Sequence, residues 1–179
     1  KELVSKTVDA LYTHGNTLAV APTGAGKTIM LSAVLGRMFD RDIERACVLA
    51  HRDELTFQNE GKFKRVNPSL STSIFNANEK SWDGQVAFAM VQTLSRESNL
   101  QSLPPLDALV IDEAHHARAD SYMRVIEHAQ RLNPKMKPWK EKGLENVALS
   151  TRIVSRQGCE SICRQAFEFA KKHGRKRVT

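Results

Sequence analysis

One eight-residue segment near the N-terminus, Ala21–Thr28, constrains this chain more than any other. Its sequence is Ala-Pro-Thr-Gly-Ala-Gly-Lys-Thr, with a short apolar run, 17–20, before it and an apolar run, 29–35, after it. That order predicts a strand, a glycine loop and a helix, which is the setting that a phosphate-binding loop requires. The usual pattern has glycine at the place of Ala21, so we interpret the segment as a variant.

The residue types in this loop match the chemistry of a bound phosphate. Gly24 and Gly26 allow a tight turn that directs backbone N–H groups at phosphate oxygens, and the helix that begins at Lys27 adds the positive end of its dipole. Lys27 supplies a charge for the outer phosphates, and the hydroxyl of Thr28 can bind Mg²⁺. The predicted nucleotide-binding residues are Pro22, Thr23, Gly24, Ala25, Gly26, Lys27 and Thr28. The alternative is a glycine-rich turn before an ordinary helix.

A second polar cluster follows the apolar run that ends at Ile111. Asp112 at the tip of this predicted strand can hold the hydration shell of Mg²⁺, and Glu113 is placed to orient or deprotonate an attacking water. We expect His115 near the outermost phosphate, and we predict Lys27, Asp112 and Glu113 as the catalytic residues. The alternative for the pair of acids is a solvated turn at the end of a strand.

The order of the predicted elements indicates an α/β fold. Helices are expected at 2–14, 27–39, 53–63, 91–96 and 119–131, with strands to residue 21 and at 46–50, 71–75, 85–90 and 106–111. Alternation of this kind predicts a parallel sheet with helices on both faces, and ligands then bind at the carboxyl ends of the strands. The glycine loop, the pair His51–Arg52 and the pair Asp112–Glu113 all fall at such ends.

Charge is distributed unevenly along the 179 residues, which carry a net charge of +7. Residues 1–137 hold 17 Lys and Arg against 16 Asp and Glu, whereas residues 138–179 hold 10 against 4. The basic excess of the second part favours either nucleic-acid binding through phosphates or a solvated helix face. The sequence shows no apolar stretch of membrane-spanning length and no secretory signal pattern, and its three cysteines are sparse, so we expect a cytoplasmic protein without membrane partners.

Residues from about 3 to 137 resemble the first motor domain of superfamily 2 helicases and translocases, in particular the group with the motor subunits of restriction enzymes. Segments 21–28 and 112–115 match the family's motifs I and II, and segments 48–55 and 90–94 are similar to two further motifs. The resemblance implies a RecA-like P-loop NTPase fold, ATP with Mg²⁺, and movement along nucleic acid, for which we expect DNA rather than RNA. It implies nucleic-acid contacts for His51, Arg52, Gln92 and Thr93.

The resemblance also implies a second RecA-like domain that supplies arginine side chains, and the sequence shows no match to one. Because such an arginine contributes about 10³–10⁵-fold to phosphoryl transfer, we expect this chain to bind nucleotide and to hydrolyse it slowly. A second motor domain or a nuclease subunit is the expected protein partner. Two alternatives are a nucleotide-dependent regulatory module without translocation, and a chimera without function.

The stretch 138–179 forms the second predicted unit. Its pattern predicts a strand, an amphipathic helix ended by Gly174, and the start of a further strand. From about residue 143 it is similar to an internal segment of the isocitrate and isopropylmalate dehydrogenase family, one without the family's main catalytic residues. The stretch is therefore either foreign to the motor domain or the completion of its sheet, and we expect no dehydrogenase activity.

Overall fold

The computed structural model of this chain describes residues 2–15, 17, 19, 21, 25–112 and 119–134. The helices are α1 (Glu2–His14), α2 (Lys27–Phe39), α3 (Asp53–Val66), α4 (Val91–Leu94), α5 (Glu97–Leu100) and α6 (Asp120–Leu132). The strands are β1 (Ala46–Ala50), β2 (Thr72–Phe75), β3 (Val86–Met90) and β4 (Ala108–Ile111).

The four strands form one sheet in the order β2-β3-β1-β4, and every pair of neighbours is parallel. Ala50 is paired with Met90, and Leu49 with Ile111, so β1, β3 and β4 end at nearly the same level. The backbone N–H of Asp112 continues the ladder by donating to the carbonyl of Leu49, 3.1 Å away. This register brings the residues that follow the three strands to one edge of the sheet.

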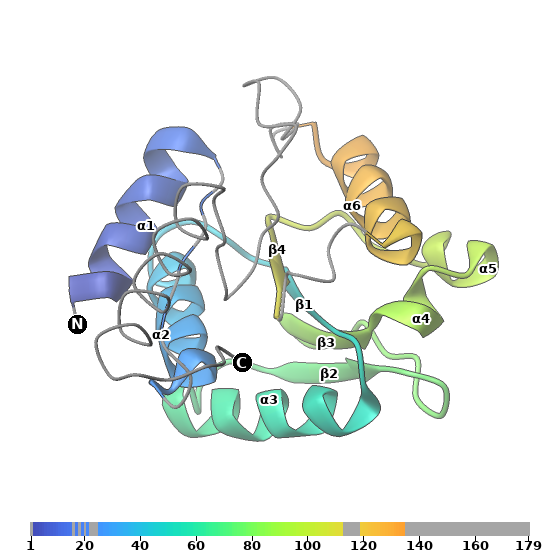
Figure 1. Ribbon diagram of the computed structural model, residues 1–179, viewed down its shortest axis with the longest axis horizontal. Helices are drawn as coiled ribbons and strands as arrows, with labels where there is room; N and C mark the ends of the chain where they lie inside the picture. Colours follow the sequence, from blue (N-terminus) through green and yellow to red (C-terminus); the bar gives the residue numbers. More distant parts are fainter. Residues whose placement is uncertain are drawn as a thin grey trace, which may run out of the picture.

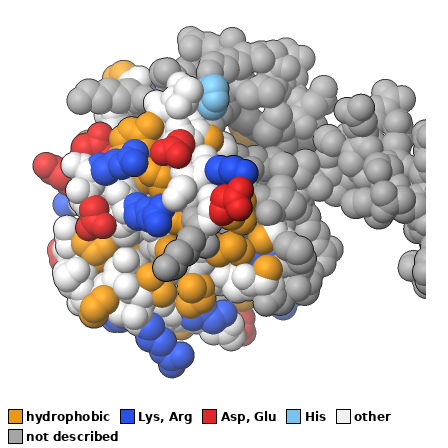
Figure 2. All heavy atoms as spheres, turned by 90° about the vertical axis from the view of Figure 1, so that its left-hand side faces the viewer, with side chains coloured by type: hydrophobic (Ala, Val, Ile, Leu, Met, Phe, Trp, Pro, Cys, Tyr) orange, Lys and Arg blue, Asp and Glu red, His pale blue; other side chains and the backbone are white. Residues whose placement is uncertain are grey.

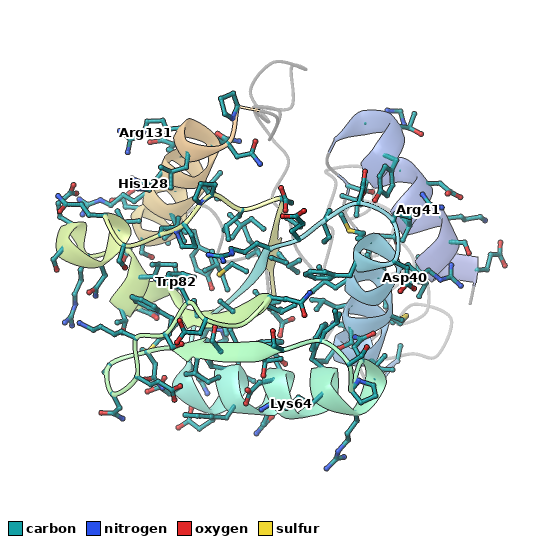
Figure 3. The ribbon with its side chains drawn as sticks, turned by 180° about the vertical axis from the view of Figure 1, so that it is seen from behind. Asp40, Arg41, Lys64, Trp82, His128 and Arg131 are labelled. Carbon is teal, nitrogen blue, oxygen red and sulfur yellow. The ribbon has the colours of Figure 1, made fainter. Side chains whose placement is uncertain are left out.

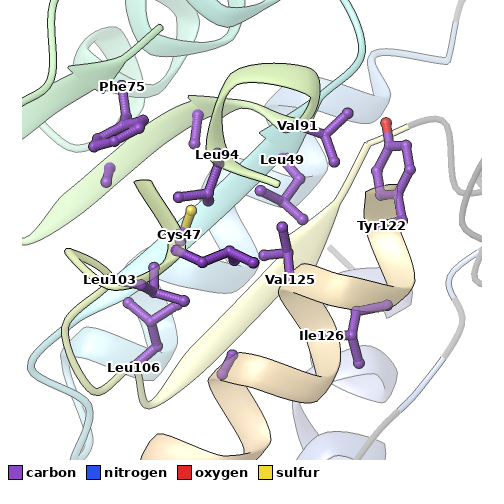
Figure 4. Packing of buried hydrophobic residues seen from close by; sticks show 14 of the residues in the cluster. Cys47, Leu49, Phe75, Val91, Leu94, Leu103, Leu106, Tyr122, Val125 and Ile126 are labelled. Atoms are coloured by element: carbon purple, nitrogen blue, oxygen red, sulfur yellow. The ribbon is translucent and has the colours of Figure 1, made fainter. Parts of the chain in front are cut away.

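Helices cover both faces of the sheet, with α1 and α2 on one side and α4, α5 and α6 on the other (Figure 1). All residues of β1 are buried, as expected for a parallel strand between two layers. Their side chains alternate between two apolar clusters. Cys47 and Leu49 pack with α4 and α6, as Figure 4 shows, whereas Ala46 and Val48 pack with α2 and α3.

Aromatic contacts anchor both clusters. Phe63 of α3 meets Phe88 of β3 edge to face, with ring centroids 5.6 Å apart. On the other face the ring of Phe75 in β2 stacks against Trp82, labelled in Figure 3, at 4.6 Å. Pairs of this kind add about 0.5–1.5 kcal/mol to the free energy that their buried area contributes.

The predicted α/β fold with a parallel sheet and helices on both faces is confirmed. The helices expected at 2–14 and 27–39 and the strand at 46–50 have the predicted bounds, and the other predicted elements differ by up to three residues at an end. One prediction was incomplete, because the segment expected as a single short helix at 91–96 consists of α4 and is followed by a separate helix, α5. The Thr93 carbonyl accepts a bond from the buried Asn99, which fixes this double turn.

Two predictions concern residues that the structure does not describe. The strand expected to end at residue 21 includes residues 18 and 20, which are not described, and the whole of the predicted unit 138–179 lies outside the described residues. Within the described ranges, no helix has both the length and the apolar character that a membrane span requires.

Candidate functional site

The candidate site lies at the edge of the sheet where β1, β3 and β4 end. His51 and Arg52 follow β1, Gln92 and Thr93 follow the end of β3, and Asp112 follows β4. Because the strands are parallel and in register, these residues come together although up to 61 sequence positions separate them, and this is the edge at which open α/β sheets bind ligands.

The N-terminus of α2 has the properties of an anion site. Gly26 precedes the helix with φ 73° and ψ 39°, a left-handed conformation that favours glycine, and no side chain caps the helix. The first turn of α2 contains no acidic residue, and Ala25 and Gly26 are exposed. The first backbone N–H groups of a helix have no partner within it, so they and Lys27 can receive a phosphate group.

Asn59, a residue that the sequence analysis did not select, connects this helix to the end of β4. Its Nδ2 donates to Oδ2 of Asp112 at 2.8 Å, and its Oδ1 lies 3.4 Å from the Thr28 hydroxyl, which donates to it. Asn59 is 3 % exposed and Asp112 is 8 % exposed. The amide therefore brings together the two residues that the sequence predicts as Mg²⁺ ligands.

The donor set suits Mg²⁺. A hydroxyl and a carboxylate are hard oxygen ligands, and Mg²⁺ in nucleotide sites is bound by one or two such groups together with phosphates and water. Both groups lie within hydrogen-bond distance of the same small side chain, so they are close to each other. Among the described residues, no group of three or more His, Cys, Asp and Glu side chains is arranged to hold a metal by itself.

The residues predicted to contact nucleic acid differ in exposure. Arg52, whose extended backbone begins α3, is exposed, and so is Gln92, whereas His51 is partly buried. Thr93 is only 4 % exposed, and its hydroxyl lies 3.8 Å from Sδ of Met90. Arg52 and Gln92 are thus the two of the four whose side chains are most accessible to a partner.

Several predicted site residues lie outside the described part of the chain. These are Pro22, Thr23, Gly24, Glu113 and His115. Their roles remain predictions from the sequence.

Asn59 left a weak signal in the sequence. The buried residues of α3 are Thr56, Asn59 and Phe63, so two polar side chains lie on the face that an apolar stripe usually occupies. A polar residue on a buried helical face requires a hydrogen-bond partner, but the pattern does not identify which one.

A parallel sheet, a helix that begins after glycine without a side-chain cap, and an acid at the end of a strand together define the class of nucleotide-binding RecA-like domains. Comparison with known proteins specifies the family. Residues 1–136 match the model of the type III restriction enzyme res subunit, and the chain belongs to this family. This family relationship confirms the superfamily 2 motor domain that the motifs at 21–28 and 112–115 predicted.

Curated relatives match over much of this chain and a small part of their own length. The putative ATP-dependent helicase IRC3 of Saccharomyces cerevisiae is 29 % identical over an alignment of 116 residues, and the match covers 59 % of this chain and 16 % of that protein. The ATP-dependent DNA helicase MPH1 of Pyricularia oryzae is 31 % identical over an alignment of 131 residues, and the match covers 66 % of this chain and 12 % of that protein. The chain thus spans less than a quarter of the length of these relatives.

Solved structures confirm the fold. The SWI2/SNF2 ATPase core of Sulfolobus solfataricus in complex with dsDNA aligns with a TM-score of 0.62 at 17 % identity, covering 99 % of this chain and 40 % of that one. Dbp5 of S. cerevisiae bound to RNA and ADP BeF3 aligns with a TM-score of 0.59, also at 17 % identity, covering 90 % and 43 %.

Proposed function

We propose that this chain binds ATP with Mg²⁺ and couples its hydrolysis to nucleic-acid binding, as one motor domain of a longer helicase or translocase. The observation that supports this most directly is the bridge from Thr28 through Asn59 to Asp112. It brings a residue of the glycine loop and an acid 84 positions later to one buried point beside an uncapped helix N-terminus.

Each site residue has a defined task in this proposal. Lys27 and the backbone N–H groups of α2 bind the phosphates, and Thr28 and Asp112 hold Mg²⁺, which neutralises charge on the transferred phosphoryl group. Glu113, next to Asp112, orients the attacking water. A second RecA-like domain completes the site with arginine, so turnover by this chain alone is slow.

Nucleic acid is the proposed partner at the same edge of the sheet. Arg52 and Gln92 are exposed there, and three of the relatives are named as helicases. The face formed by α1 and α2 is a poorer candidate, because its basic and acidic side chains are interspersed (Figure 2) and Lys6 and Arg41 pair with Glu2 and Asp9. Of the two nucleic acids we propose DNA, since one relative is named a DNA helicase.

Thermal unfolding of the full chain with and without Mg²⁺-ATP tests nucleotide binding. A ligand that binds only the folded state stabilises it by about 2.7 kcal/mol at a concentration of 100 times Kd, and Tm rises accordingly. Lys27→Ala is expected to abolish this rise, since the variant lacks the charge at the phosphates.

Lys64→Ala is the matched control, because Lys64 lies on the outside of α3 (Figure 3). The Lys64 side chain is 56 % exposed, and it forms an ion pair with Glu60. The control should keep the full rise in Tm. An equal rise in the Lys27→Ala variant would contradict the proposed phosphate site.

A second measurement separates the motor from a regulatory module. Binding of labelled single-stranded and double-stranded DNA and RNA is measured with and without ATP, and Arg52→Ala should weaken it without changing the nucleotide-dependent Tm. Nucleotide binding without any effect on nucleic-acid binding would favour the regulatory module instead.

The cytoplasmic location stays a prediction, since one relative is named as mitochondrial. Imaging of a tagged full-length protein tests this location.

A further inference from the structure

Asn59 occupies an unusual position for an amide side chain. It lies in the second turn of α3, almost completely buried, with one bond to the glycine-loop helix and one to the end of β4. Thr28 is 31 positions away in the sequence and Asp112 is 53 positions away. Burying an amide removes it from water, which costs free energy, and its hydrogen bonds to the two neighbouring elements offset that cost.

The chemistry of the partners fixes the orientation of this amide. An ionised carboxylate only accepts hydrogen bonds, so the NH₂ group of Asn59 must face Asp112 and its oxygen must face Thr28. An amide oxygen only accepts, so the Thr28 hydroxyl must direct its proton at Asn59. The remaining lone pairs of that hydroxyl then point away from the amide.

We infer that Asn59 is a positioning residue for the Mg²⁺ of the bound nucleotide, an inference that rests on the proposed function. It turns the proton of Thr28 away from the ion and holds one carboxylate oxygen of Asp112, which leaves the hydroxyl lone pairs for the metal. The N–H bond from Asn59 to Oδ2 fixes the orientation of the Asp112 carboxylate at the end of β4. Partners of this kind orient metal ligands and raise metal affinity.

The inference also gives α3 a role in the site. The helix begins directly after Arg52, a predicted nucleic-acid contact, and reaches the metal ligands two turns later through Asn59. A shift of α3 along its axis would therefore change the bond from Asn59 to Asp112.

The test is a titration of a fluorescent ADP analogue with the full chain, first in EDTA and then at increasing Mg²⁺. Asn59→Leu keeps the number and branching of the side-chain heavy atoms and removes both bonds. The Mg²⁺ concentration that gives the half-maximal increase in affinity should rise by about 10–100-fold, the usual loss when such a partner is removed. The affinity in EDTA should stay unchanged, since Asn59 does not contact the phosphates in this proposal.

Asn67→Ala is the matched control. Asn67 also ties α3 to α2, by donating to the carbonyl of Ser32 at 2.9 Å, but it lies eight positions further along the chain. This variant should lose stability and keep the Mg²⁺ midpoint. A second variant, Asn59→Ser, replaces Asn59→Leu if circular dichroism shows that the leucine variant does not fold, and the same rise is expected.

The outcomes are distinct. An unchanged Mg²⁺ midpoint in the Asn59 variants would overturn the inference and leave the proposed function intact. A lower midpoint would also overturn it, because it would mean that the amide competes with the metal. Absence of nucleotide binding by the unmodified chain, with or without Mg²⁺, would overturn the proposed function and the inference together.

Discussion

Gly84 lies just before β3, close against the backbone of β2, and Gly84→Ala should destabilise the sheet strongly. A Cβ atom at this position would lie 2.3 Å from the carbonyl carbon of Thr72 and 2.5 Å from the backbone nitrogen of Ser73. Ordinary van der Waals contact begins at 3.4 Å, so the two segments would have to separate by about 1 Å. The obstacle is backbone, which cannot rotate away as a side chain can.

Two hydrogen bonds near this end of the β2–β3 pair would be stretched or broken by that displacement. The N–H of Val86 donates to the carbonyl of Ser71 at 3.1 Å, and the N–H of Gln85 donates to the Ser71 hydroxyl at 3.0 Å. Each contributes about 1 kcal/mol net, and forcing an extra methyl group into a packed site costs about 1–3 kcal/mol. We therefore expect the free energy of unfolding to fall by about 3–5 kcal/mol when both bonds are lost, from a total of about 5–15 kcal/mol for a typical domain.

Urea denaturation of the full chain, followed by far-ultraviolet circular dichroism, measures the change. Gly61→Ala provides the matched control, because Gly61 lies inside α3 and a Cβ there has no heavy atom within 4 Å. Replacing a glycine in an unobstructed helix interior should raise the free energy of unfolding by about 0.5–1 kcal/mol. The same substitution is thus expected to have opposite signs at the two positions.

A Gly84→Ala variant as stable as the unmodified chain would refute the reasoning. It would mean that β2 can move outwards by the required distance without loss of its ladder. A Gly61→Ala variant with lower stability would refute the other half, because it would require a contact at that face of α3.

Two further predictions concern titratable side chains. Partial burial and the hydrogen bond to Asp42 raise the pKa of Tyr12 from 10.0 to about 12, against the opposing charge of Arg41, which lies 4.8 Å from the ring centroid. The stabilisation of the fold by this phenol should be complete below pH 10 and lost as the pH rises through about 12. The tyrosinate absorbance of the unmodified chain minus that of Tyr12→Phe should therefore show a titration midpoint near pH 12. A midpoint near pH 10 would contradict the hydrogen bond between Tyr12 and Asp42. Burial raises the pKa of the Cys47 thiol, so in a Cys159→Ser, Cys163→Ser background a thiol reagent should react with Cys47 only after urea is added, and rapid reaction of the native chain would contradict the packing of β1.

Local sequence patterns predicted most of the elements, for a physical reason. The bounds of α1, α2 and β1 follow from apolar spacing and from glycine and polar residues at the ends, and both signals depend on neighbours in the chain. The double turn α4–α5 was predicted incompletely, because it depends on a bond from Asn99 to the Thr93 carbonyl. No local pattern contains that bond.

The candidate site divides in the same way. The glycine loop and the acid after β4 could be predicted because each is a short motif with its own chemistry, whereas the burial of Thr93 and the exposure of Arg52 depend on how α3 and α4 pack. Arg52 and Gln92 became the better candidates for nucleic-acid contact only from their exposure in the folded chain.

The sequence by itself determined that this chain forms a parallel α/β sheet with a glycine-rich segment before α2 and an acid after β4, because periodicity and motif composition are local properties. Only the tertiary structure decided the strand order β2-β3-β1-β4 and the place of Asn59 between Thr28 and Asp112. Both depend on contacts between residues far apart in the chain. Such contacts form only when helices pack on both faces of the sheet. For this reason only the folded structure shows that the partners of Asn59, a polar residue on a buried face of α3, are Thr28 and Asp112.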